Sequence, residues 1–355
     1  MKSTLQKIAY EQELKKVARR LGLTLRGNLE EAVLDYCKKQ IEQWVAAHSQ
    51  PKTLTELLAL VATSLGIVFE EIHNTNDLEA LLVRIPPQQE PIMARLNTEF
   101  DDKTDAVTIR RDHRESWEQP FLAVINCQGW HGFRRYFSKW HEAAHRLIAG
   151  QQLQFAFRRT PIPELRREPQ EILVDKIAAT LAFYSGIFEP VFREEFERSS
   201  RLTFKMIDDI RLKVAPDASR HATILACLSY CPHPAWFLRC SMALKKGEER
   251  QLPQMRLFPD KVQKTIPKLR VREMSSSPAV SNTGIRIHQN MQVPASSIVG
   301  QAFRDPTGSL HEGREPLEAW ETSSTGPIGY GTLEVEALRI DDEVWALLHL
   351  VKHSG

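Results

Sequence analysis

The segment His141-Glu142-Ala143-Ala144-His145 constrains this chain more than any other part of its sequence. On a helix, residues four positions apart lie on the same face, so both imidazoles can reach one metal ion. Glu142 lies one step around the helix, where its carboxylate can take a proton from a water molecule at that metal. This H-E-x-x-H pattern is typical of zinc peptidases. The alternative is a helix whose two histidines are surface groups.

A catalytic zinc ion usually has three protein ligands and one open position, so the two histidines need a partner. The next segment with helical spacing places Glu171 and Asp175 on one face. We predict that Glu171 is the third ligand and that Asp175 accepts a hydrogen bond from the far nitrogen of a ligand histidine. Glu168 competes for the ligand role, but Pro169 directly after it disfavours a helical conformation there. The alternative for Glu171 is a solvated residue that stabilises the helix N-terminus.

The H-E-x-x-H segment, followed by Glu171-x-x-x-Asp175 and an alanine-rich helix, resembles the ImmA/IrrE family of bacterial metallopeptidases. The family usually has Asn where this chain has Asp175, while Ala178 matches the family pattern. The resemblance covers roughly residues 50–200 and implies a zincin-like domain with Zn²⁺ as its cofactor.

Members of the family cleave helix-turn-helix repressors and thereby derepress an operon, often after DNA damage or in anti-phage loci. The resemblance therefore implies a helix-turn-helix repressor as the substrate. The N-terminal extension and the basic residues would suit a CapP-type protease of an anti-phage CBASS operon. Single-stranded DNA is the candidate activator. The rival hypothesis is a DNA-binding regulator whose zinc site is structural or vestigial. An open fourth position separates the two, because a structural zinc ion has four protein ligands.

Composition sets the remaining expectations. The 355 residues carry a formal net charge of +2, which gives no overall nucleic-acid footprint. The five cysteines include no C-x-x-C pair, which is typical of a reducing cytoplasm. The polar start lacks the apolar core of a signal peptide, and no apolar run is long enough to cross a membrane. We expect a cytoplasmic protein with no membrane partner.

The spacing of apolar residues along the chain predicts an α+β fold in four regions. These are an N-terminal helical region (1–50), the metallopeptidase domain with a small antiparallel sheet and active-site helices (51–200), a helical linker module (201–255) and a β-rich domain (256–355). The family includes members with a GAF-like sensor domain at this end, so the resemblance implies one here. We expect residues 151–168 to form a loop. Strands are expected at 67–72, 92–96, 106–109, 121–125, 271–274, 284–288, 332–339 and 343–351, with a turn at 341–342.

The expected loop after the metal-binding helix is basic, with Arg158, Arg159, Arg166 and Arg167. Further arginines in this half of the chain are Arg110, Arg111, Arg114, Arg134 and Arg135. With aromatic residues nearby, such a surface could hold single-stranded nucleic acid. It could equally be a rim for an acidic repressor segment, or a solvated face.

One cysteine could silence a catalytic zinc site by occupying its open position. Cys127, just past an expected strand, is the candidate for this inhibitory thiol, and Cys231 is the alternative. A buried, inert thiol is the competing interpretation for each. His113 and His131 are expected at the surface, with oxyanion stabilisation as their alternative role.

Overall fold

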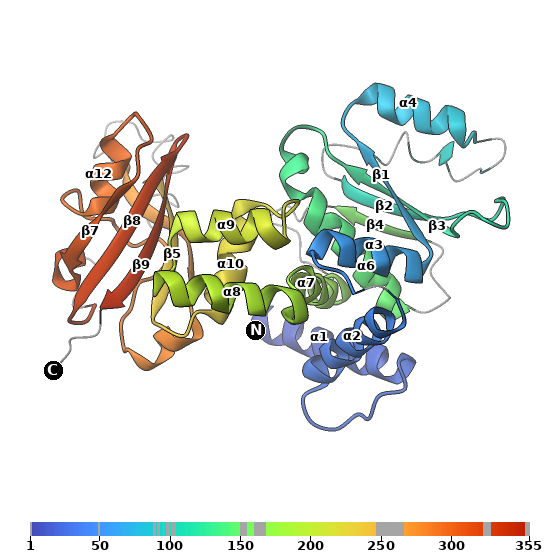
Figure 1. Ribbon diagram of the computed structural model, residues 1–355, viewed down its shortest axis with the longest axis horizontal. Helices are drawn as coiled ribbons and strands as arrows, with labels where there is room; N and C mark the ends of the chain where they lie inside the picture. The colour runs from blue at the N-terminus through green and yellow to red at the C-terminus, as the bar shows by residue number, and fades with distance from the viewer. Residues whose placement is uncertain are drawn as a thin grey trace. The chain divides into compact units, whose positions relative to one another are not determined.

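The computed structural model describes residues 2–48, 50–87, 90, 93–94, 96, 100, 104–149, 155–159, 168–245, 266–321 and 328–351. The chain divides into two compact units. The first unit contains Met1–Pro190 and Lys213–Ser219, and the second contains Val191–Leu212 and Arg220–Gly355. Both units combine helices with a sheet, so the predicted α+β class is confirmed (Figure 1).

The first unit begins with the helices that apolar spacing predicts for residues 1–50. Its first three helices are α1 (Lys2–Arg20), α2 (Leu29–Ala47) and α3 (Leu54–Leu65). Asn28 caps α2, because its side chain accepts a hydrogen bond from the backbone N–H of Glu31. Gly66 ends α3 in the left-handed conformation, with a φ of 70°. No helix within the described ranges is both long and apolar enough to span a membrane.

A four-stranded sheet forms the centre of the first unit. Its strands are β1 (Ile67–Ile72), β2 (Thr104–Arg110), β3 (Phe121–Asn126) and β4 (Phe155–Arg159), in the order β1-β3-β2-β4. β1 is parallel to β3, while β2 is antiparallel to both β3 and β4. The sheet is therefore mixed, and the expectation of an antiparallel sheet is wrong for the β1–β3 pair. The chain passes through α4 (Thr75–Arg84) between β1 and β2, which gives it the length to return in the same direction.

Two local predictions in this unit are wrong. In the strand expected at 92–96, Met93, Ala94 and Leu96 are helical. Met93 and Leu96 are buried in the same apolar cluster, so their three-residue spacing marks one face of a helical turn. β4 lies inside the segment 151–168, which was expected to be a loop. The strand was not predicted because five residues are too few to show a clear alternating pattern.

Helix α6 (Arg135–Ala149) carries the H-E-x-x-H segment and follows the short helix η1 (Gly129–Arg134). It contacts the sheet on one side: the guanidinium of Arg146 lies 3.6 Å from the ring centroid of Phe121 on β3. It also packs against α7 (Pro169–Ala182), where the hydroxyl of Tyr136 donates a 2.6 Å hydrogen bond to the carbonyl of Ala182. Helix α6 is thus held between the sheet and α7.

The second unit is built on a five-stranded antiparallel sheet in the order β6-β5-β9-β8-β7. Its strands are β5 (Ala235–Ala243), β6 (Lys268–Ser276), β7 (His311–Pro316), β8 (Thr332–Ile340) and β9 (Glu343–Val351). The helices that lie wholly in this unit are α10 (Arg220–Tyr230), η4 (Pro278–Asn282), α12 (Ile298–Arg304) and η5 (Leu317–Trp320). The end of α8 (Ser185–Ser199) and most of α9 (Phe204–Val214) also belong to it. Trp236 and Trp320 are the largest side chains of its apolar core.

The β6, β8 and β9 strands and the turn at Asp341 are confirmed, and Asp341 has the positive φ of 53° that a tight turn needs. Residues 284–288 form no strand, while β5 and β7 were not predicted. β5 lies between β6 and β9 in the sheet, yet it precedes the expected boundary at residue 256. The segment expected to be a helical linker therefore supplies an inner strand of the second unit.

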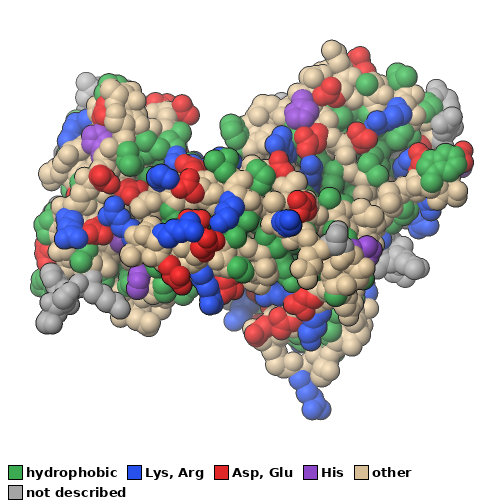
Figure 2. Space-filling model, viewed as in Figure 1, with side chains coloured by type: hydrophobic (Ala, Val, Ile, Leu, Met, Phe, Trp, Pro, Cys, Tyr) green, Lys and Arg blue, Asp and Glu red, His purple; other side chains and the backbone are tan. Residues whose placement is uncertain are grey.

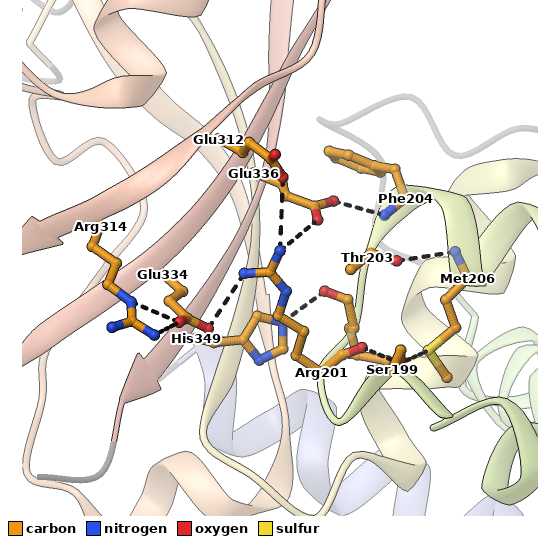
Figure 3. Close-up of polar contacts among 11 residues, drawn as sticks. Ser199, Arg201, Thr203, Phe204, Met206, Glu312, Arg314, Glu334, Glu336 and His349 are labelled. Carbon is orange, nitrogen blue, oxygen red and sulfur yellow. Dashed lines mark hydrogen bonds and ion pairs between the residues drawn. The ribbon is translucent and has the colours of Figure 1, made fainter. Parts of the chain in front are cut away.

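Polar contacts tie the α8–α9 connection to the sheet within the second unit (Figure 3). Arg201 lies 3.3 Å from Glu334 and 3.5 Å from Glu336, both on β8. Glu336 also accepts a 2.9 Å hydrogen bond from the backbone N–H of Phe204, at the start of α9. On β9, Nε2 of His349 lies 2.9 Å from the carbonyl oxygen of Leu202. These contacts explain why this part of the predicted linker belongs to the same unit as the strands.

Candidate functional site

The candidate site brings together α6 and the first turns of α7 in the first unit. His141 and His145 are both buried, and Glu171 is partly exposed. Nε2 of His141 lies 3.0 Å from Nε2 of His145 and 3.1 Å from Oε2 of Glu171. Nε2 of His145 lies 3.2 Å from Oε1 of Glu171. These three side chains are close enough together to hold a metal ion.

Asp175 fixes the orientation of the first histidine. Its Oδ1 atom lies 3.0 Å from Nδ1 of His141, one helical turn beyond Glu171. A proton on Nδ1 would be donated to this carboxylate, which leaves the lone pair of Nε2 free to face His145 and Glu171. Asp175 therefore lies beside the far nitrogen of the candidate ligand His141, where the sequence places it.

The charge of Glu171 suits a cation. Burial alone would raise the pKa of Glu171, but its hydrogen bonds with His141 and His145 hold that pKa well below its ordinary value. The carboxylate is therefore ionised at neutral pH. Two imidazole nitrogens and one carboxylate form a donor set that divalent zinc favours.

Glu142 is completely buried and points toward the sheet. The hydroxyl of Thr108 on β2 donates a 2.6 Å hydrogen bond to Oε2 of Glu142. Oε1 of Glu142 is also buried and has no hydrogen-bond partner among the described residues. Oε2 is thus held by the sheet, while Oε1 accepts no hydrogen bond from a described side chain. Thr108 is the site residue that the sequence analysis missed.

Glu168 is not part of the group formed by His141, His145 and Glu171. It is the N-cap residue of α7, in an extended conformation, and Pro169 begins the helix. Glu171 was preferred because a proline disfavours a helical conformation in the residue before it, and Glu168 is indeed extended.

Cys127 lies in a different cluster from the expected one. Its thiol is grouped with Glu71 and His73, and it does not belong to the group that contains His141. Burial raises the pKa of Cys127 to about 11, so the free thiol is protonated at neutral pH. The described residues therefore give no support to a Cys127 thiol that caps the candidate metal site.

Cys231 belongs to the second unit, where it is buried and its thiol donates to the carbonyl oxygen of His233. Burial raises its pKa as well. All five cysteines are free thiols.

The nine arginines of the expected basic surface fall into two groups. Arg166 and Arg167 lie outside the described residues, and only the backbone of Arg158 and Arg159 is described, in β4. The other arginines of this half have partners: Arg110 with Asp112, Arg111 with Glu118, Arg134 with Asp105, Arg135 with Asp217, and Arg114 with two backbone carbonyls. Figure 2 likewise shows Lys and Arg side chains interspersed with Asp and Glu. Four of these five described arginines are therefore paired with a carboxylate.

His131 is buried, contrary to the expectation of a surface histidine. Its Nδ1 atom lies 2.8 Å from Oδ1 of the buried Asp105 on β2, and its ring stacks on Trp130 at 3.9 Å. This pair joins η1 to the start of β2 and so helps to place the N-terminal end of α6. His113 lies in a groove beside the β2–β3 connection.

No family model matches this chain, and no curated protein matches it significantly. The function of the chain is therefore inferred from the geometry of the site and from the H-E-x-x-H segment.

Proposed function

We propose that this chain is a zinc-dependent endopeptidase. The observation that carries the proposal is the combination of three clustered ligand side chains with a buried, partly unpartnered glutamate next to the first of them. When bound, zinc supplies Lewis-acid chemistry: it polarises a carbonyl group and makes water more acidic. Glu142 takes a proton from the attacking water and later delivers it to the leaving amine.

The supporting residues each act on one atom of this arrangement. Thr108 holds Oε2 of Glu142, which leaves Oε1 as the oxygen that handles the proton. Asp175 holds the ring of His141 in the tautomer that a metal ligand needs. The group formed by the described residues has three members, which favours an open position over a closed structural site.

The substrate class comes from the resemblance to the ImmA/IrrE family. On that basis the chain cleaves a helix-turn-helix repressor in the cytoplasm, with a zincin-like fold in the first unit and a GAF-like sensor in the second. Single-stranded DNA is the proposed activator. The alternative is a DNA-binding regulator whose zinc ion has only a structural role.

The test is the cleavage of a helix-turn-helix protein encoded beside this chain. The wild type and Glu142→Gln would be loaded with zinc, their metal contents would be measured, and both would be incubated with the candidate substrate. We expect equal zinc contents and cleavage by the wild type alone, because the amide cannot take a proton from water. Full cleavage by zinc-loaded Glu142→Gln would remove Glu142 from the mechanism. Tight DNA binding by a wild type that cleaves nothing would favour the regulator.

A further inference from the structure

A second cluster of metal-ligating side chains lies at the ends of two neighbouring parallel strands in the first unit. Glu71 is near the end of β1, His73 follows that strand, and Cys127 follows β3. The strands end in register, with Ile72 opposite Asn126, and the backbone N–H of Cys127 donates a 2.8 Å hydrogen bond to the carbonyl of Ile72. The topology of the sheet therefore brings together a thiol, an imidazole and a carboxylate that are far apart in the sequence.

The spacing of this cluster suits a single ion. One ligand atom from each of the three residues lies within 4.8 Å of the others. Nε2 of His73 is 3.2 Å from Oε2 of Glu71, and the equivalent separations in the His141 site are 3.0–3.2 Å. Two ligands about 2.1 Å from a tetrahedral zinc ion are separated by roughly 3.4 Å, so the His73–Glu71 pair and the His141 site need only small adjustments to bind.

The surrounding charges hold the cluster in place without using all of its ligand atoms. Lys139 on α6 lies 2.6 Å from Oε1 of Glu71, which leaves Oε2 for His73 or an ion. Arg135 lies 3.8 Å from Oε2 of Glu71 but is closer, at 3.3 Å, to Asp217. With the thiol protonated, the carboxylates of Glu71 and Asp217 balance these two cations. Loss of the thiol proton adds one negative charge, which an incoming divalent cation would neutralise.

The backbone of His73 is also fixed. Its N–H donates a 2.8 Å hydrogen bond to Asp77, in the first turn of α4. The imidazole is exposed, whereas the Cys127 thiol is buried, so an ion would enter from the solvent side and meet the thiol last.

We propose that Glu71, His73 and Cys127 form a second metal site, which binds a thiophilic divalent transition metal such as Zn²⁺ or Co²⁺. On binding, the sulfur–metal bond forms as the thiol proton leaves to water, and no oxidation is involved. The inference does not depend on the proposed peptidase function, because the two sites share no ligand. The alternative is a salt-bridge cluster that binds no metal.

Cobalt distinguishes the two sites, because only one of them contains a thiolate. The metal-free full-length protein would be titrated with Co²⁺ alone and followed by absorption in the near ultraviolet. A sulfur-to-cobalt charge-transfer band reports thiolate ligation and is not expected from the two histidines and one glutamate of the first site. We expect this band in the wild type and in Glu171→Gln, and we expect added Zn²⁺ to bleach it.

Two variants assign the ligands. Cys127→Ala should abolish the band, and Cys37→Ala, another buried thiol of the first unit, should keep it. His73→Ala should raise the apparent dissociation constant for Co²⁺ by on the order of tenfold or more. Losing a residue that only supports a ligand already costs about that much affinity, and loss of a ligand itself should cost at least as much. His48→Ala is the matched control, because His48 is likewise exposed.

The proposal is overturned if the wild type gives no thiolate band, or if the band persists in Cys127→Ala. Since His73 is at the surface, its replacement tests the site even if the Cys127 variant does not fold. Unchanged Co²⁺ affinity in His73→Ala would also overturn the three-ligand site. None of these results would bear on the His141 site, which contains no thiol and gives no such band.

Discussion

Replacing Thr108 by Val tests how the sheet positions Glu142. The two side chains nearly match in shape, but Val cannot donate the 2.6 Å hydrogen bond that Thr108 gives to Oε2 of Glu142. Both residues are buried, and Oε1 of Glu142 already has no partner among the described residues. The substitution would therefore leave a buried carboxylate with neither of these oxygens held by a described side chain.

The structure sets the size of the effect. A hydrogen bond to a charged group contributes about 1.5–3 kcal/mol, so the free energy of unfolding should fall by about 2 kcal/mol. If the same interaction also holds Glu142 in its reactive orientation, kcat should fall by roughly 10- to 100-fold, because each 1.4 kcal/mol corresponds to about tenfold in rate. KM should change little, since Thr108 contacts Glu142 rather than a substrate.

Urea denaturation, zinc content and steady-state cleavage would be measured on Thr108→Val and Thr108→Ser. The Ser variant keeps the hydroxyl and should retain kcat within a few-fold of the wild type. Zinc content should be equal in all three proteins, because Thr108 is not a ligand. A Val variant with wild-type kcat would refute the positioning role, and equal losses in the Val and Ser variants would assign the effect to packing instead.

Two other expectations follow from the same structure. Glu171→Ala should remove most of the bound zinc, whereas Asp175→Ala should weaken zinc affinity or activity by about 10- to 100-fold. If Glu168→Ala loses its zinc and Glu171→Ala keeps it, Glu168 rather than Glu171 is the third ligand. Burial lowers the pKa of His349 from 6.5 to about 4, so the unfolded chain takes up this proton first as the pH falls. The stability that this difference provides is complete above pH 6.5 and is lost toward pH 4, a change on the order of 3 kcal/mol. His349→Gln keeps a donor for the carbonyl of Leu202, and its urea midpoint should fall less over this range; an unchanged pH dependence would exclude His349 as a source of acid sensitivity.

The helical parts of the fold were the most predictable from sequence. Apolar spacing and the Asn28 cap define α2, and the H-E-x-x-H segment lies in α6 as expected. Helical order depends on neighbours three and four positions away, so a single sequence window contains the necessary information.

The strands were less predictable because their partners are far away in the sequence. The first four residues of the inner strand β5 are all buried, so the strand does not show the alternation that marks a half-buried strand. β7 is an edge strand with charged residues such as Glu312 and Arg314 along its length, a pattern that a loop shares.

The candidate site shows the same division. Glu171 and Asp175 could be placed because they share a helix face at the spacing a metal site needs. Thr108 could not be placed from the sequence, because its contact with Glu142 depends on how α6 packs against β2. Cys127 was assigned to the wrong neighbours for the same reason: its position follows from the parallel pairing of β1 and β3, which the sequence does not reveal.

Anomalous diffraction at the zinc edge, from crystals of the zinc-loaded protein, would show whether His141, His145 and Glu171 hold a catalytic zinc ion. We expect one zinc ion about 2.0–2.2 Å from Nε2 of His141, Nε2 of His145 and a carboxylate oxygen of Glu171, with a remaining position open to solvent. A site without zinc, or one closed by a fourth protein ligand, would contradict a catalytic metal centre at this helix.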